Sequence, residues 1–152
     1  MLKGLREMLN RTLGDTEQDD PGVREHGLQL ATATLLIEVM RADYQENLTE
    51  NEAVFAQVKR FFSLSEDEAL LLVKEAETEA DHSVELQSFT RLLHERLSLE
   101  DKHAVVEMLW RVALADDHLD KHEDHLVRKL ASLLYVSHND LIRIRNTVRE
   151  TQ

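Results

Sequence analysis

A single proline and four glycines are spread over the 152 residues of this chain. Because these two residue types interrupt most helices and strands, their scarcity favours long helices joined by short connections. Leu, Ala, Glu and Arg, all abundant here, are strong helix formers. Apolar residues recur at three- and four-residue spacing, and no stretch shows the alternation of a half-buried strand. The sequence therefore predicts an all-α fold.

The apolar spacing predicts eight helices, with a polar break at residues 80–83. They span residues 2–13, 23–43, 49–62, 66–79, 86–97, 99–116, 121–134 and 138–148. Most are expected to begin at a Ser, Thr or Asp cap, often with Glu three residues later. These caps are Thr49, Ser65, Ser98, Asp120 and Ser137. Trp110 falls at an apolar helix position and is predicted to lie in the core.

The first predicted helix, residues 2–13, combines apolar spacing with three basic residues, Lys3, Arg6 and Arg11. Such a helix suits an arm that docks on a membrane surface or a partner. Because the segment is short and has no aromatic anchor, it better suits a first helix that packs on the acidic body of the protein. Residues 14–22 carry four acids and Pro21, and we expect them to form a mobile linker.

The formal net charge is −12, from 30 acidic and 18 basic residues. Nucleic acid would be repelled by this charge, whereas cations or a protein partner with a basic surface would be attracted. No apolar run is long enough for a transmembrane segment, so only peripheral membrane association stays open. The start lacks the features of a signal peptide, and cysteine is absent. We expect a cytoplasmic protein.

The densest cluster of charge is at residues 115–124, which contain five acids and two histidines between two predicted helices. A fainter version occurs at residues 42–50, where Asp43 precedes Asp116 by 73 positions. Residues 35–43 match residues 108–116 at this spacing. Beyond the first loop, which is one residue longer, the spacing becomes 72, and Ser65 matches Ser137. The chain is therefore predicted to contain two similar helical halves. We call residues 42–50 the first acidic corner and residues 115–124 the second, and both are expected to lie at one end of the molecule.

Hard divalent cations prefer several carboxylate and carbonyl oxygens. The candidate ligands are Asp43, Glu50, Asp116 and Glu123, with Asp117 and Asp120 as supporting acids. The cluster lacks the glycine and the final acid of an EF-hand loop, and its histidines lack a zinc-protease spacing. Calcium, magnesium or manganese is therefore expected rather than zinc. The alternative is that these acids cap helices and stabilise helix dipoles with no ion bound.

No phosphate-binding loop, nucleophile elbow or cysteine nucleophile is present, so the sequence does not predict an enzyme. Three segments, 89–93, 109–123 and 133–137, resemble the TerB-like tellurite-resistance family of bacterial proteins. The resemblance implies a helical domain at residues 23–152, with two similar halves and acids proposed to bind a divalent metal. Asp117 and Tyr44 stand where that family often has glycine.

Two functions follow from these observations. The first is a non-enzymatic, metal-binding TerB-like module linked to tellurite resistance or the stress response. The second is an acidic protein-interaction scaffold that binds no metal.

Overall fold

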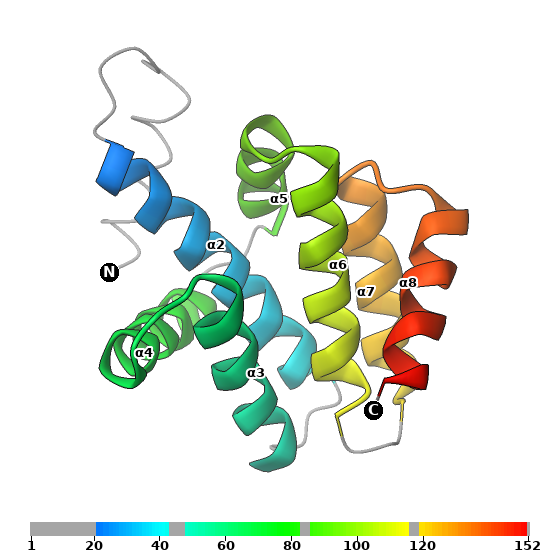
Figure 1. Cartoon of the computed structure of the whole chain (residues 1–152), viewed down its shortest axis with the longest axis horizontal. Coiled ribbons are helices and arrows are strands. Elements are labelled where there is room, and N and C mark those ends of the chain that lie inside the picture. Colours follow the sequence, from blue (N-terminus) through cyan, green and yellow to red (C-terminus); the bar gives the residue numbers. More distant parts are fainter. Residues whose placement is uncertain (1–20, 43–47, 83–85, 116–118, 152) are drawn as a thin grey trace.

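The computed structural model describes residues 21–42, 48–82, 86–115 and 119–151. These ranges contain seven helices and no strand, so the predicted all-α fold is confirmed (Figure 1). The helices are α2 (Pro21–Arg41), α3 (Leu48–Phe61), α4 (Glu66–His82), α5 (Leu86–Arg96), α6 (Leu99–Ala113), α7 (Lys121–Leu133) and α8 (His138–Glu150). The predicted helix at residues 2–13 lies outside the described residues.

Several predicted boundaries were wrong by a few residues. Helix α2 starts at Pro21, so the last two residues of the predicted linker belong to its first turn. Proline suits that position because the first amides of a helix have no intrahelical partner. Helix α3 starts at Leu48, which places Thr49 inside the helix rather than at its cap. Helices α2 and α6 end at Arg41 and Ala113, before the acidic corners rather than within them.

The largest correction concerns residues 80–82, which the sequence predicted as the beginning of a polar break. They form the last turn of α4, and Ala80 is buried in the hydrophobic core. Packing of this small side chain against other helices outweighs the polar character of its neighbours, Asp81 and His82. Tertiary contacts commonly override local propensity in this way.

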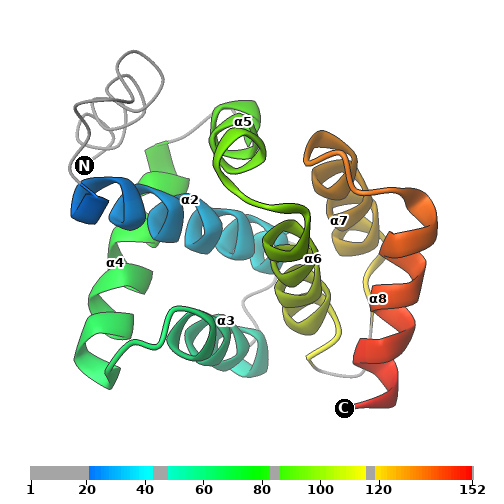
Figure 2. The same ribbon diagram turned by 45° about the horizontal axis from the view of Figure 1, so that its top comes forward.

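Helix α2 lies at the centre of the fold. It contacts α3, α4, α5, α6 and α7. Figure 2 shows α4 crossing behind the N-terminal half of α2, α3 below α2, and α6, α7 and α8 towards its C-terminal end. Residues 30–37 are all at most 2% exposed, so the middle of this helix is buried around its whole circumference. Two threonines in this run, Thr32 and Thr34, donate their hydroxyls to carbonyl oxygens four residues earlier, at 2.8 and 2.7 Å.

The predicted serine caps are confirmed. Ser65 and Glu68 form a reciprocal capping box: the Ser65 amide donates to Glu68 Oε1 at 2.9 Å, and the Glu68 amide donates to Ser65 Oγ at 3.1 Å. The Ser65 amide thereby lowers the pKa of the Glu68 carboxyl. Ser98 accepts from the amide three residues later at 3.1 Å, and Ser137 does the same at 3.2 Å.

The internal repeat extends to the backbone of the helix ends. Ser63 and Tyr135, 72 positions apart, are the non-glycine residues with positive φ in the described ranges, at 54° and 60°. Each follows a helix and has the two hydrogen bonds of a Schellman helix end. The bonds are Leu64 N to Lys59 O (2.9 Å) and Ser63 N to Arg60 O (3.3 Å), then Val136 N to Ala131 O (2.9 Å) and Tyr135 N to Ser132 O (3.0 Å). Equivalent helices in the two halves therefore end in the same backbone conformation.

Trp110 is fully buried, which confirms its predicted place in the core. Its indole Nε1 donates to the carbonyl oxygen of Leu141 at 3.2 Å, which joins α6 to α8. The polar atom of this large side chain is thus satisfied inside the core, as buried tryptophan usually requires.

We expect Ser63→Gly to raise the free energy of unfolding by about 0.5 to 1 kcal/mol, because glycine adopts positive φ without a Cβ clash. Tyr135→Gly should raise the free energy of unfolding by less, because it also removes the contact between the Tyr135 and His94 rings, whose centroids are 4.4 Å apart. Urea unfolding measures both. A lower stability for Ser63→Gly would contradict the left-handed helix end.

Trp110→Phe should lower the free energy of unfolding by about 1 to 3 kcal/mol, because it leaves a cavity and removes the hydrogen bond to Leu141. Urea unfolding followed by circular dichroism is the suitable measurement, since the substitution removes the only tryptophan. Tyr135→Phe, at a side chain that is 73% exposed, is the control and should change stability by less than about 0.5 kcal/mol. Equal effects of the two substitutions would argue against a packing role for the indole.

Candidate functional site

The predicted metal ligands fall into two groups. Asp43, Asp116 and Asp117 lie outside the described residues, and Glu50 lies in α3 with its side chain undescribed. Asp120 and Glu123 are described, and both stand at the beginning of α7. The geometry of the complete predicted ligand set therefore stays a prediction.

Glu123 occupies the first turn of α7, and its residue is only 1% exposed. It is one of two buried carboxylate residues in the described part of the chain; the other, Glu79, lies on α4, and burial raises its pKa. A buried carboxylate is costly unless positive charge or hydrogen-bond donors compensate it. The partial positive charge at the N-terminus of α7 provides part of that compensation for Glu123.

Asp120 is the N-cap of α7, as predicted. Its Oδ2 accepts a hydrogen bond from the amide of His122 at 2.8 Å. One carboxylate oxygen thus holds the start of the helix, which is the capping role that the sequence left open for these acids. A carboxylate has several acceptor sites, so this bond is compatible with a further ligand. The neighbouring Asp124 instead forms an ion pair with Arg128 at 2.9 Å.

The first corner differs because a cationic side chain stands beside it. Helix α2 ends at Arg41, whose Nη1 donates to Asp81 Oδ1 at 2.6 Å. Burial raises the pKa of the nearby Glu38 carboxyl. The positive charge of Arg41 lowers this pKa, and the negative charge of Asp81 raises it. Arg41 was not among the residues predicted for this corner, although it stands two residues before Asp43 in the sequence. At the corresponding position of the second half stands Leu114, so the second corner lacks this arginine.

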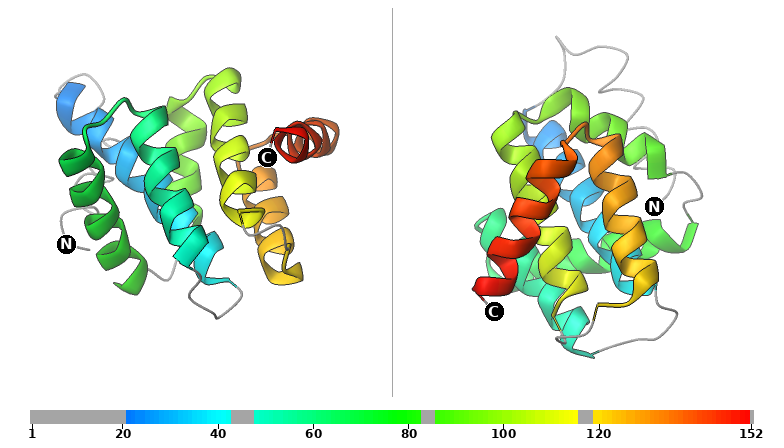
Figure 3. Two further views of the ribbon diagram at one scale, coloured as in Figure 1. Left: turned by 60° about the horizontal axis from the view of Figure 1, so that its bottom comes forward. Right: turned by 90° about the vertical axis from the view of Figure 1, so that its right-hand side faces the viewer.

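Four helix ends flank the two corners on one side of the molecule. Figures 1 and 3 show the C-terminal ends of α2 and α6 on the same side as the N-terminal ends of α3 and α7. The C-terminal end of a helix carries free carbonyl groups and partial negative charge. Carbonyl oxygens of this kind are suitable ligands for hard cations.

Within the described ranges, no three His, Asp or Glu side chains are grouped closely enough to hold a metal ion. His122 and His125, at the beginning of α7, are exposed. None of the described helices is both long enough and apolar enough to cross a membrane.

Comparison with known proteins identifies one family. The family model described as "Tellurite resistance protein TerB" matches residues 29–146, a range that begins in α2 and ends in α8. No curated protein and no solved structure matches the chain. The matched range includes both acidic corners and covers more than half of the sequence. The chain therefore belongs to the TerB tellurite-resistance family.

Proposed function

We propose that this TerB-family chain is a non-enzymatic module that binds a divalent cation at its acidic corners and serves tellurite resistance or the stress response. Asp116 and Glu123 would be the main ligands of the second corner, and Asp43 and Glu50 those of the first. Asp117 and Asp120 would support them. The observation that carries the proposal is the burial of the Glu123 carboxylate in the first turn of α7, six residues after Asp117.

The charges favour a hard cation at the second corner in particular. In the first corner, Arg41 stands two residues before Asp43 and is held by an ion pair with Asp81 at 2.6 Å, so part of the acidic charge near that corner is already neutralised. The second corner has Leu114 at the matching position and keeps Asp116, Asp117 and Asp120 close in sequence. Oxygen ligands of this type suit calcium, magnesium or manganese.

A direct encounter with tellurite is disfavoured, because this oxyanion would approach a protein of net charge −12. The proposed contribution to resistance is therefore indirect, through a bound cation or a bound partner.

The second candidate function is an acidic protein-interaction scaffold that needs no metal. Two adjacent leucines on α4, Leu70 and Leu71, are 46% and 65% exposed. They follow the acidic first turn of α4, which contains Glu66, Asp67 and Glu68. Exposed apolar side chains beside negative charge suit a partner with a basic, partly apolar surface.

We expect calcium, magnesium or manganese to bind the chelator-treated protein in calorimetry. At about 100 times Kd, one bound ion adds about 2.7 kcal/mol to the free energy of unfolding. Asp116→Asn and Glu123→Gln should each weaken binding about tenfold or more, because each removes a ligand charge.

Asp67→Asn is the matched control for this prediction, since it removes an exposed acid from the first turn of α4, outside either corner. It should leave the affinity unchanged. If none of the three ions binds or raises Tm, the metal-binding function is refuted and the scaffold function stands alone.

A further inference from the structure

The C-terminal hairpin formed by α7 and α8 differs in charge from the chain as a whole (Figure 3). Residues 119–151 contain six basic and five acidic residues, whereas the whole chain contains 18 and 30. The excess of acids therefore lies outside this hairpin. An anion that approaches α7 and α8 is repelled far less than the net charge of −12 suggests.

A groove of about 470 Å³ lies where α7 turns into α8. Its apolar wall consists of Tyr135, Val136 and Leu141, and its polar residues include Arg128, Ser132 and His138. A concavity of this volume is within the range of about 300 to 1,000 Å³ typical of ligand pockets. Tyr135 lies about two helical turns beyond Arg128, a separation of about 10 Å, so the groove is long enough for a small organic molecule.

Arg128 is one of three arginines that come together between α7 and α8. Arg145 and Arg149 follow Leu141 at intervals of four residues, so they continue the same face of α8 beyond the groove. Burial lowers the pKa of the Arg145 guanidinium, and the positive charges of Arg149 and Arg128 lower it further. The negative charge of Asp124 opposes this by raising the pKa. Like charges placed this close repel one another, so the cluster is costly unless an anion compensates for it.

The described residues compensate for only one of these three charges. Asp124 Oδ2 pairs with Arg128 Nε at 2.9 Å. Neither Arg145 nor Arg149 forms an ion pair with any residue of the described ranges. The Nε of Arg145 is buried and has no hydrogen-bond partner. A buried donor of this kind is rare in native proteins and calls for an explanation. Three arginines and one aspartate leave two positive charges for a ligand.

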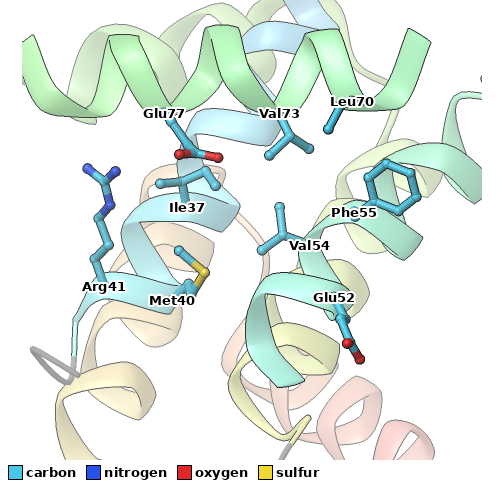
Figure 4. Close-up of a pocket in the computed structure, with 9 residues that line it drawn as sticks. All are labelled: Ile37, Met40, Arg41, Glu52, Val54, Phe55, Leu70, Val73 and Glu77. Atoms are coloured by element: carbon cyan, nitrogen blue, oxygen red, sulfur yellow. The ribbon is translucent and has the colours of Figure 1, made fainter. Parts of the chain in front are cut away.

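The first half of the repeat forms the same helices without these arginines. Counted 72 positions earlier, Arg145 corresponds to Val73 and Arg149 to Glu77, both on α4. Val73 and Glu77 line the groove between α2, α3 and α4, and Figure 4 shows Val73 pointing into the space between these helices. Arg145 therefore takes a place where the other half packs an apolar side chain against the core. Departures of this kind from good packing are expected at functional sites.

We propose that the groove between α7 and α8 binds a phosphate monoester. The phosphate would lie among Arg128, Arg145 and Arg149, and the organic group would lie along the apolar wall towards Tyr135. Guanidinium groups match phosphate oxygens with paired hydrogen bonds. A phosphate monoester carries a charge of about −1.5 to −2 at pH 7, which matches the two positive charges that the cluster leaves free. The site contains none of the proposed cation ligands, so it does not depend on a bound metal.

Calorimetry on the full-length protein, in a phosphate-free buffer at about pH 7.5, compares three matched ligands. Hexyl phosphate should bind about tenfold or more tightly than inorganic phosphate, because it also buries the hexyl chain in the groove. Hexyl sulfate has the same shape but a single charge, and it should bind about tenfold more weakly than hexyl phosphate. Equal affinity for hexyl phosphate and inorganic phosphate would overturn the place of the organic group. Equal affinity for hexyl phosphate and hexyl sulfate would overturn the charge match.

Two variants that remove the same charge from α8 locate the site. Arg145→Gln should weaken the binding of hexyl phosphate about tenfold or more, because it removes a guanidinium from the cluster. Arg143→Gln is the matched control, since Arg143 is exposed on the same helix and pairs with Asp140 at 3.2 Å. It should change the affinity less than about twofold. Equal losses in both variants would show that the ligand responds only to net charge, which excludes the site.

Arg145→Val copies the first half and separates a ligand-binding role from a structural one. It should weaken binding about tenfold or more while Tm stays the same or rises, because it removes the buried Nε that has no partner. A lower Tm with unchanged binding would give Arg145 a structural role and overturn the proposal. Circular dichroism checks that each variant is folded.

Ser132→Phe tests the groove itself, since Ser132 is exposed and lines it. The added ring should weaken hexyl phosphate binding about tenfold and change inorganic phosphate binding less than about twofold. If vesicles that contain phosphatidic acid bind the protein and hexyl phosphate does not, the ligand is a membrane surface and the soluble monoester is excluded. If no ligand binds, the phosphate site is refuted, whereas the cation proposal, tested with metal ions alone, is unaffected.

Discussion

The burial of the middle of helix α2, residues 30–37, is the interaction on which the rest of the structure depends. Residues 30–37 are shielded on every side, and α3, α4, α5, α6 and α7 all contact this helix. A helix can be buried this fully only if it carries no unsatisfied polar side chain. Thr32 and Thr34 meet that condition by donating to their own helix at 2.8 and 2.7 Å. Both halves of the repeat therefore share one core, and the end of α2 sets the position of the first corner.

The two halves use the same backbone plan and differ in a few side chains. Ser63 and Tyr135 end equivalent helices in the same left-handed conformation, and Ser65 and Ser137 begin the next helices with the same cap. Against this common frame, Trp110 replaces Ile37 and Leu114 replaces Arg41. The first replacement places a larger side chain in the core of the second half, and the second removes an arginine from the corner of that half.

Much of the fold was predictable because the relevant interactions are local in sequence. Helix periodicity, the Ser65–Glu68 capping box and the Ser137 cap depend on residues within four positions of one another, and each is confirmed. The errors occurred where distant contacts compete with local preference. Burial of Ala80 extends α4 into residues predicted to be a break. For the candidate site, sequence supplied the acids and their chemistry, and the structure added the burial of Glu123 and the capping role of Asp120.

The amino-acid sequence by itself determined the all-α class, the internal repeat, the family and the set of acids proposed as cation ligands. These properties follow from spacing and residue type, which need no knowledge of long-range contacts. Only the tertiary structure decided that Arg41 pairs with Asp81, that the Glu123 carboxylate is buried, and that a groove lies between α2, α3 and α4. Each of these depends on how helices pack, and packing brings together residues that are dozens of positions apart along the chain.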